Sequence, residues 1–288
     1  MSKFVLSAFG DEIDMSLDVQ MEELNSYNIK HIELRGVDGK NVSELSLDEA
    51  RNIKRRLDDK GFKISALGSP IGKINITDAF EDHLNMFDNL LEIALILDTK
   101  YIRIFSFFIP KNEDPDKYFS EVLARLKKFT IRAEKKGIIL LHENEKDIYG
   151  DIPERCLKIL TSINSPNFKA IFDPANFIQC NVETYPYAFN MLKDYIQYMH
   201  IKDAFLESGH VVPVGSGDGK IFEILTQLKN SKFEGFLTLE PHLGAFEGLE
   251  KLEKNIDIKN IKKGGKYSFS VAFEALNKVL NNLILIGD

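Results

Sequence analysis

The sequence predicts an α/β protein with the fold of a (β/α)8 TIM barrel in a single domain. Three observations support this prediction. Eight short apolar or alternating segments have the character of strands, segments of helical periodicity lie between them, and neighbouring strands start about 27 to 38 residues apart. One βα unit has roughly this length, and eight in a row favour a closed barrel. An open doubly wound sheet is the structural alternative, but no G-x-G-x-x-G motif follows the first strand and no strand-to-helix turn resembles a P-loop.

The expected strands are short runs rich in β-branched, aliphatic and aromatic residues, which suit a half-buried or fully buried strand. They lie at residues 4–8, 31–34, 63–66, 101–105, 138–142, 170–172, 198–201 and 236–239.

The segments between the strands place apolar residues at helical spacing. The clearest predicted helices are 17–27, 47–60, 80–97, 117–136 and 221–229. Gly61, Gly137 and Gly235 each stand one to three residues before a strand, where a glycine suits the left-handed residue that ends a helix.

The end of the chain differs in character from the repeating βα units. Residues 254–265 are polar and rich in lysine, which predicts a loop, and residues 268–283 then predict a final helix packed outside the barrel. We therefore expect one domain over residues 1–288 with a C-terminal extension from about residue 254.

Composition limits the classes of partner. The chain of 288 residues is 44% hydrophobic and 28% charged, as in ordinary globular proteins, and its formal net charge of −7 argues against a nucleic-acid partner. Cys156 and Cys180 have no metal-binding or redox spacing, and no targeting or membrane-spanning segment is visible, so we expect a cytoplasmic protein. The expected partner is a small molecule rather than a membrane. One sequence leaves a homodimer open.

Charged residues follow nearly every predicted strand, at the end where a βα barrel gathers its active site. Four of them offer metal-ligand chemistry on consecutive strands, namely Glu143, Asp173, His200 and Glu240. If the residues two positions earlier face the barrel axis, strand alternation makes all four side chains converge. A single acid after a strand is usually a solvated loop residue, but four in register favour a metal site. Three carboxylates and one imidazole suit one Mn²⁺, Mg²⁺, Co²⁺ or Zn²⁺ ion.

Four motifs carry a resemblance to a known family. Leu-His-Glu-Asn at 141–144, Phe-Asp-Pro-Ala-Asn at 172–176, Met-His-Ile-Lys-Asp at 199–203 and Leu-Glu-Pro-His at 239–242 resemble the xylose isomerase-like barrel superfamily. Within it, the chain looks like the sugar phosphate isomerase/epimerase group.

The resemblance implies that the four ligands bind one divalent metal and that Glu143 and Glu240 are also catalytic. In the epimerases that the chain resembles, these two glutamates exchange protons with a substrate carbon through a metal-stabilised enediolate. One departure is Asn176, which stands where many relatives carry a histidine. An amide can donate a hydrogen bond to substrate but carries no proton at neutral pH.

Several further polar residues at the strand ends are candidates for substrate binding. They are Glu33, Arg35, Ser69, Lys73, Arg103, His142, Asn176, Lys202 and His242.

The basic residues among these candidates, together with the flexible segment 68–73, favour a phosphorylated or acidic polyol. A purely structural pair between Glu33 and Arg35 is the alternative for those two residues. The glycine-rich turn at 215–219 resembles a phosphate-binding loop but lacks the lysine and threonine order of a P-loop, and we assign it a structural role first.

The leading hypothesis is a metal-dependent isomerase or epimerase of a small sugar or sugar derivative. A dehydratase of an inosose-like ketone is the nearest alternative, with His242, His142 or Lys202 as the acid that protonates the leaving hydroxyl. A non-catalytic sugar-binding barrel is the alternative from another class. DNA repair of the endonuclease IV type is disfavoured, because the third and fourth strands end in Ser69 and Ser106 instead of extra histidine ligands.

Overall fold

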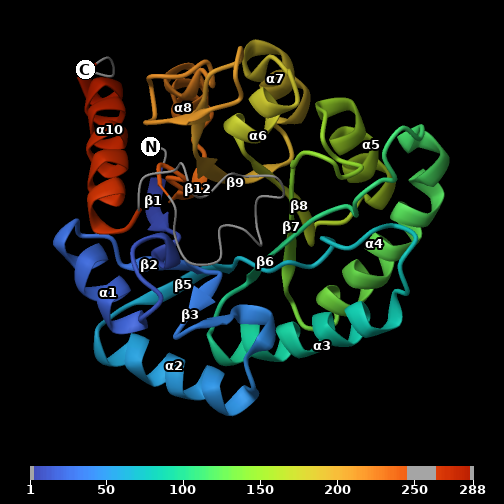
Figure 1. Ribbon diagram of the computed structural model, residues 1–288, viewed down its shortest axis with the longest axis horizontal. Helices are drawn as coiled ribbons and strands as arrows, with labels where there is room; N and C mark the ends of the chain where they lie inside the picture. Colours follow the sequence, from blue (N-terminus) through green and yellow to red (C-terminus); the bar gives the residue numbers. More distant parts are fainter. Residues whose placement is uncertain (1–2, 245–263, 286–288) are drawn as a thin grey trace.

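Eight parallel strands close into a barrel in the computed structural model, which describes residues 3–244 and 264–285 (Figure 1). Around the barrel the strands follow the order β1-β12-β9-β8-β7-β6-β5-β2, so that β1 pairs with both β12 and β2. This closure confirms the predicted barrel and excludes the open sheet. The strands are β1 (Lys3–Ala8), β2 (His31–Leu34), β5 (Lys63–Leu67), β6 (Tyr101–Ile104), β7 (Ile139–Glu143), β8 (Phe168–Phe172), β9 (Ile196–Ile201) and β12 (Glu234–Leu239).

Helices surround the barrel, and all but the final helix lie in the connections between successive barrel strands (Figure 1). They are α1 (Leu17–Ser26), α2 (Leu47–Asp59), α3 (Glu81–Ile96), α4 (Phe119–Glu134), α5 (Pro153–Ile163), α6 (Pro174–Gln179), α7 (Phe189–Leu192), α8 (Ile221–Asn230) and α10 (Lys266–Leu285). Of these, α5, α6 and α7 lie outside the predicted helical segments, and α6 and α7 are too short for a helical period to be visible. Among the described residues, every helix falls short of the length and apolar character needed to cross a membrane.

Short helices and hairpins lie in the loops that follow the carboxyl ends of the strands. They are the one-turn helix η1 (Gly10–Glu12) and two small hairpins, β3 (Gly36–Val37) with β4 (Lys40–Asn41) and β10 (Asp203–Ala204) with β11 (Val211–Val212).

The apolar core consists of a large layer between barrel and helices, a smaller cluster inside the barrel, and a third, small cluster of Ala175, Ile178 and Ala204. Ala66, Leu141, Ile171 and Tyr198 form the inner cluster, which confirms that the residues two positions before Glu143, Asp173 and His200 face the axis. The Tyr198 hydroxyl lies 2.8 Å from Ser65 Oγ and accepts a hydrogen bond of 2.6 Å from Thr238. Side chains therefore fill the middle of the barrel, and we look for a site at its carboxyl end, where barrels of this kind hold their catalytic residues.

The final helix α10 packs against α1 and α8 on the outside of the barrel, as predicted (Figure 1). The ring of Tyr27, at the end of α1, packs in tilted orientation against Phe269 and Phe273 of α10, with ring centroids 5.6 and 4.5 Å away. The expected loop at 254–263 and the start of the extension near residue 254 lie outside the described residues.

Two of the three predicted helix-ending glycines have the expected left-handed backbone. Gly61 and Gly137 have φ of +68° and +66°. The prediction for Gly235 is wrong, because this residue lies within β12 and Lys232, with φ of +60°, takes the left-handed position. A Cβ atom on Gly235 would come within 2.7 Å of the carbonyl oxygen of Gln197, so close packing of strands requires glycine here.

Candidate metal centre

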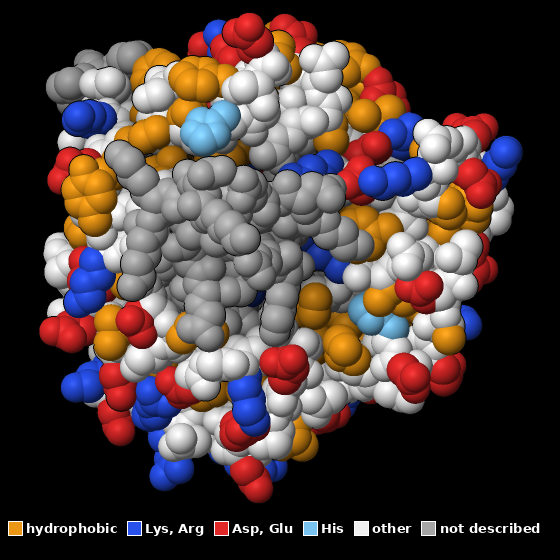
Figure 2. Space-filling view, viewed as in Figure 1, with side chains coloured by type: hydrophobic (Ala, Val, Ile, Leu, Met, Phe, Trp, Pro, Cys, Tyr) orange, Lys and Arg blue, Asp and Glu red, His pale blue; other side chains and the backbone are white. Residues whose placement is uncertain are grey.

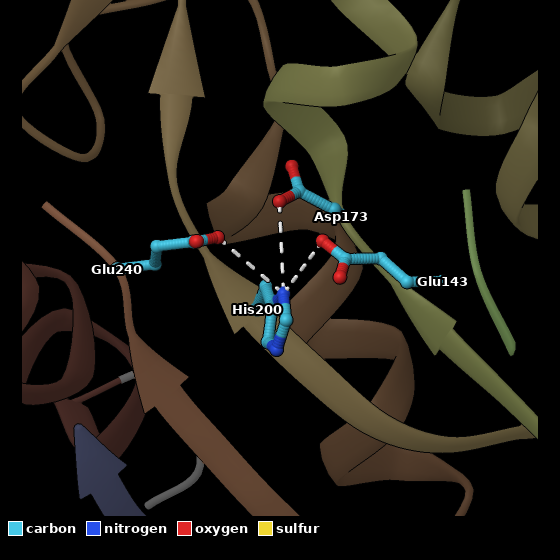
Figure 3. Close-up of side chains that lie close together, drawn as sticks. All are labelled: Glu143, Asp173, His200 and Glu240. Carbon is cyan, nitrogen blue, oxygen red and sulfur yellow. Dashed lines mark hydrogen bonds and ion pairs between the residues drawn. The ribbon is translucent and has the colours of Figure 1, made fainter. Parts of the chain in front are cut away.

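The four residues with metal-ligand chemistry come together at the carboxyl end of the barrel (Figure 3). Glu143 ends β7, Asp173 follows β8, His200 lies in β9 and Glu240 follows β12. All four are buried, and one ligand atom of each lies within 4.8 Å of the others. Strand alternation in a barrel produces this convergence, because residues at equal height on neighbouring strands point to the same axis.

The ring of His200 directs one nitrogen at three carboxylates. Its Nδ1 lies 3.0 Å from Glu143, 3.4 Å from Glu240 and 3.8 Å from Asp173 (Figure 3). Its Nε2 lies 3.1 Å from Oε2 of the buried Glu33. A carboxylate on the far nitrogen is the usual arrangement for a metal-binding histidine, since it holds the proton on Nε2 and turns the Nδ1 lone pair towards the cation.

The donor set fits a hard divalent cation. Three carboxylates and one imidazole nitrogen face a common point in a site shielded from water, and oxygen-rich sets of this kind bind Mn²⁺, Mg²⁺, Co²⁺ or Zn²⁺. Burial alone would lower the pKa of His200, but Glu143 and Glu33 raise it well above its usual range. The carboxylates favour a positive charge beside them, which either a proton on this ring or a bound cation would supply.

Lys202 and Arg103 are ion-paired with the ligands. Lys202 Nζ lies 3.0 Å from Asp173 Oδ2 and 3.1 Å from Glu240 Oε2. Burial alone would lower the pKa of Lys202, but these two carboxylates raise it well above its usual range, so the lysine keeps its charge. Arg103 Nη1 lies 3.2 Å from Glu143 Oε2. These two cations restrain the positions of the ligand carboxylates.

Arg35 joins the first two strands to the metal ligands. Its guanidinium binds Asp11 with two contacts of 2.7 and 3.0 Å and lies 3.3 Å from Glu12 and 3.1 Å from Glu240. The alternative of a structural pair between Arg35 and Glu33 is wrong, because Glu33 faces His200 instead. Sequence reasoning missed Asp11 and Glu12 as parts of the site, although their position just after the first strand was a usable signal.

His242 lies between two acids at the edge of the centre. Its Nε2 is 3.3 Å from both Glu12 Oε1 and Glu240 Oε1, and its backbone N–H donates to Glu12 Oε2 over 2.8 Å. These three side chains form a second group of the kind that can hold a cation. Arg35 already lies against both of its carboxylates, so this group has its counter-charge within the protein.

Two asparagines connect the ends of β7 and β8 through hydrogen bonds. The Asn144 side chain accepts from the backbone N–H of Asp173 over 3.0 Å and donates to its carbonyl over 2.9 Å. Asn176 Nδ2 donates to Glu143 Oε1 over 3.2 Å and to the carbonyl of Asn144 over 2.9 Å. Asp173 caps α6 by accepting from the Asn176 N–H over 2.9 Å. Asn176 therefore touches a metal ligand directly.

The structure does not bring Ser69 or His142 to the four ligands. Ser69 Oγ is fully buried and donates to the carbonyl of Arg103, which ties two loops together. His142 points to the helix layer, because it alternates with Glu143 along β7, and its ring stacks on Phe168 at 6.2 Å. Burial lowers the pKa of His142 to about 4. Both residues make structural contacts within the protein.

The glycine-rich turn has the structural role that the sequence suggested. Asp203 accepts hydrogen bonds of 2.8, 3.1 and 2.9 Å from the N–H groups of Gly215, Gly217 and Gly219. The N–H groups that would have to bind phosphate are therefore already used by a carboxylate.

A small pocket opens at the metal ligands, and two of its cationic side chains lie against aromatic rings. Arg103 lies 5.2 Å from the ring centre of Phe9 and 5.0 Å from that of Phe105, and Lys73 lies 4.4 Å from Phe105. Nothing in the sequence pattern marked Phe9 and Phe105 as parts of the site. The pocket is lined by Arg35, Lys73, Arg103, Glu143, Glu145, Lys202, Glu240 and His242.

Comparison with known protein families shows the family to which the chain belongs. The family of xylose isomerase-like TIM barrels matches residues 21–258. The chain belongs to this family. No curated protein matches the chain in sequence.

Solved structures agree with this xylose isomerase-like fold. D-psicose 3-epimerase from Clostridium cellulolyticum H10, solved with D-tagatose, matches with a TM-score of 0.75 at 14% identity, over 96% of this chain and 99% of that one. A probable 3-DHS dehydratase from Bacillus anthracis matches with a TM-score of 0.72 at 17% identity, over 96% and 99%. The IOLI protein, solved with a bound zinc atom, matches with a TM-score of 0.71 at 16% identity, over 96% and 98%.

Proposed function

We propose that this xylose isomerase-like barrel is a divalent-metal-dependent isomerase or epimerase of a small sugar or sugar derivative, acting by proton transfer at a carbon next to a carbonyl. The observation that carries the proposal is the convergence of three carboxylates on Nδ1 of a histidine whose other nitrogen faces Glu33. Solved neighbours that include a ketose 3-epimerase support the choice of reaction.

Glu143, Asp173, His200 and Glu240 would hold the cation. A divalent cation bound there would polarise a carbonyl and a neighbouring hydroxyl, which acidifies the C–H bond between them. The residues around it then have to remove a proton from that carbon and return one to it.

Glu143 and Glu240 are the proposed proton carriers. They enter the site from strands on opposite sides of His200, and each has one oxygen directed at its ring, 3.0 and 3.4 Å from Nδ1. Their other oxygens face Arg103 at 3.2 Å and Arg35 at 3.1 Å. Neighbouring cations hold the pKa of a carboxylate down, so the carbon acid must be strongly acidified before either glutamate can act as its base.

Dehydration is the second candidate reaction, because a charged lysine lies at the ligands. Lys202 Nζ is within about one hydrogen-bond length of both Asp173 and Glu240, and it can donate a proton to a leaving hydroxyl. His242 lies at the same edge, whereas His142 faces away from the site. A solved neighbour is a probable dehydratase.

The test is proton exchange with solvent. Protein reconstituted separately with Mn²⁺, Co²⁺, Mg²⁺ or Zn²⁺ is incubated in D₂O with ketoses, ketose phosphates, uronates and inososes, and proton NMR follows the signal beside the carbonyl. We expect metal-dependent loss of that signal. The accumulating product separates epimerisation or isomerisation from dehydration.

Two variants make the test specific. Glu240→Gln should lower exchange about 10²- to 10⁴-fold, the range for loss of one acid-base group, and its metal content is measured alongside. Glu207→Gln, which changes an exposed glutamate, is the matched control and should keep the wild-type rate. Tight metal binding without exchange or dehydration on any member of the panel would refute the proposal and favour a non-catalytic sugar-binding barrel.

A further inference from the structure

Four hydroxyl groups form a connected chain inside the barrel, next to the candidate metal centre. The side chains of this hydroxyl chain are 0 to 1% exposed and come from four strands: Ser7 (β1), Ser65 (β5), Tyr198 (β9) and Thr238 (β12). Acidic and basic side chains interspersed over the coloured face in Figure 2 can bond to water. Buried hydroxyls cannot, so each hydrogen of the chain needs an acceptor within the protein.

Three contacts connect the members of the hydroxyl chain. Ser7 Oγ lies 2.6 Å from Ser65 Oγ, which in turn lies 2.8 Å from the Tyr198 hydroxyl. Thr238 donates to the Tyr198 hydroxyl over 2.6 Å. Four hydroxyls supply four hydrogens, and these three contacts use three of them. One hydrogen is therefore left for an acceptor outside the chain.

The buried carboxylate of Glu33 is a charged acceptor beside this chain. Its Oε2 lies 3.1 Å from His200 Nε2, and its Oε1 makes no hydrogen bond to any residue that the structure describes. Burial, followed by the neighbouring charge of Glu33, raises the pKa of the Tyr198 phenol well above its usual range, so this phenol stays protonated as a donor. A carboxylate is a stronger acceptor than a hydroxyl oxygen, and it attracts the remaining hydrogen.

The charge of Glu33 sets the direction of the hydrogen bonds along the chain. When Tyr198 donates to Glu33, Ser65 donates to Tyr198 and Ser7 donates to Ser65, so every hydroxyl hydrogen has an acceptor. In the reverse direction Tyr198 donates to Ser65, and among the described residues Glu33 keeps only its contact with His200. A buried carboxylate with so few donors is costly, which favours the first direction.

Packing holds the ring of Tyr198 independently of its hydroxyl. The ring centroid lies 5.5 Å from that of Phe236, 6.3 Å from that of Tyr101 and 6.0 Å from that of His200. A phenylalanine at this position would keep these contacts. Loss of the hydroxyl alone therefore acts on the site through Glu33.

We propose that Tyr198 is a positioning residue whose hydroxyl fixes the carboxylate of Glu33, so that Glu33 holds the Nε2–H of His200 and keeps Nδ1 directed at the ligand carboxylates. Ser7, Ser65 and Thr238 support this role by orienting the phenolic hydrogen. The inference rests on the metal centre of the proposed function. It assigns a role to a residue outside both the ligand set and the residues that line the pocket.

The first measurement is the Kd for Mn²⁺ or Co²⁺, determined by calorimetric titration of the full-length protein. For Tyr198→Phe we expect a Kd about 3- to 10-fold higher, less than the roughly 10- to 100-fold typical of residues that contact a ligand directly. Tyr101→Phe is the matched control, because Tyr101 packs against the same inner cluster from the start of β6. Its Kd should equal that of wild type. Urea unfolding shows that each variant is folded.

The second measurement needs neither metal nor substrate. In protein labelled with ¹⁵N-histidine, proton NMR detects the Nε2–H of His200, and His200→Gln assigns the signal by its loss. We expect this proton to exchange several-fold faster with water in Tyr198→Phe than in wild type or Tyr101→Phe, because Glu33 is less restrained. Lower stability of Tyr198→Phe with unchanged Kd and unchanged exchange would mean a purely structural role and overturn the proposal.

Failure of this inference can be told apart from failure of the proposed function. If wild type binds no metal, the proposed function fails, and the exchange of the His200 proton alone decides the role of Tyr198. Metal binding with identical Kd and exchange in wild type and Tyr198→Phe refutes only the inference.

Ser65→Ala tests the direction of the hydrogen bonds. If Ser65 donates to Tyr198, its loss leaves the phenolic hydrogen on Glu33, and we expect a Kd close to that of wild type. If Tyr198 donates to Ser65 instead, the variant turns the phenolic hydrogen towards Glu33. Tighter metal binding by Ser65→Ala would therefore overturn the proposal.

Discussion

At the scale of single residues, His200 is held in one orientation within the candidate metal centre. A buried imidazole with one nitrogen against a carboxylate and the other against three carboxylates is oriented before any cation arrives. Phe9 adds an edge-to-face contact at 5.3 Å, which further restricts the ring. A ligand that is already oriented loses little rotamer entropy on binding metal, so the residues that orient it contribute to affinity.

Removing the carboxylate behind His200 should weaken metal binding. Glu33→Ala leaves Nε2 without its acceptor and lets the ring turn, and we expect the Kd for Mn²⁺ or Zn²⁺ to rise about 10- to 100-fold. Glu33→Gln retains an acceptor oxygen and should have a smaller effect. Calorimetric titration of each variant measures the change, with Glu207→Gln, which changes an exposed glutamate, as the control. An unchanged Kd in Glu33→Ala would show that the ring is held by other contacts.

At the scale of elements, the loop between β5 and α3 is fitted tightly against the end of β6. Gly72 has φ of +91°, and a Cβ there would lie 2.1 Å from the carbonyl oxygen of Phe105. From the other side, His83 of α3 accepts a hydrogen bond of 2.7 Å from the Gly72 N–H. This loop carries Lys73 to the pocket, so backbone packing sets the position of a charged side chain.

A matched pair of glycine substitutions measures this packing. Gly72→Ala should lower the free energy of unfolding by on the order of 3–5 kcal/mol, because both the left-handed backbone and the contact with Phe105 are violated. Gly61→Ala, also left-handed but with open space around it, should cost about 1 kcal/mol. Urea unfolding gives both values. Equal losses would mean that the contact with Phe105 does not constrain the loop.

At the scale of the whole molecule, a buried histidine couples global stability to pH. Burial, assisted by the nearby charge of Arg125, lowers the pKa of His83 to about 4. The neutral Nε2 accepts a hydrogen bond from the Gly72 N–H. In the unfolded chain an ordinary histidine titrates near pH 6.5. The unfolded state therefore binds more protons between these values, and stability is fully present above about pH 6.5 and is lost as the pH falls towards 4.

The contribution of His83 is measurable by difference. Between pH 7.5 and pH 5 we expect wild type to lose about 2 kcal/mol more of its unfolding free energy than His83→Gln does, after each is compared with its own value at pH 7.5. His210→Gln changes an exposed histidine and should keep the wild-type slope. Identical pH profiles for wild type and His83→Gln would contradict the linkage.

The positions of the strands and the identity of the candidate ligands could be predicted from the sequence. Apolar runs at intervals of one βα unit specify a barrel, and Glu143, Asp173, His200 and Glu240 occupy equivalent positions on consecutive strands. Side chains alternate between the two faces of a strand with a fixed period of two residues. The face towards which a side chain points can therefore be predicted from the sequence. The same rule would have placed His142 on the outer face, because it stands next to Glu143.

The pairing of charges was decided only by the tertiary structure. Glu33 meets His200 from a distance of 167 residues along the chain, and Arg35 meets Glu240 across 205 residues. Strand alternation predicts to which face of a strand a side chain points. An ion pair depends in addition on the positions of the two charged groups, which the loop conformations and the side-chain rotamers determine. The sequence by itself thus determined the barrel and the kind of ligands at its mouth. Only the fold decided which carboxylate each cation contacts, because electrostatic energy depends on distances in space.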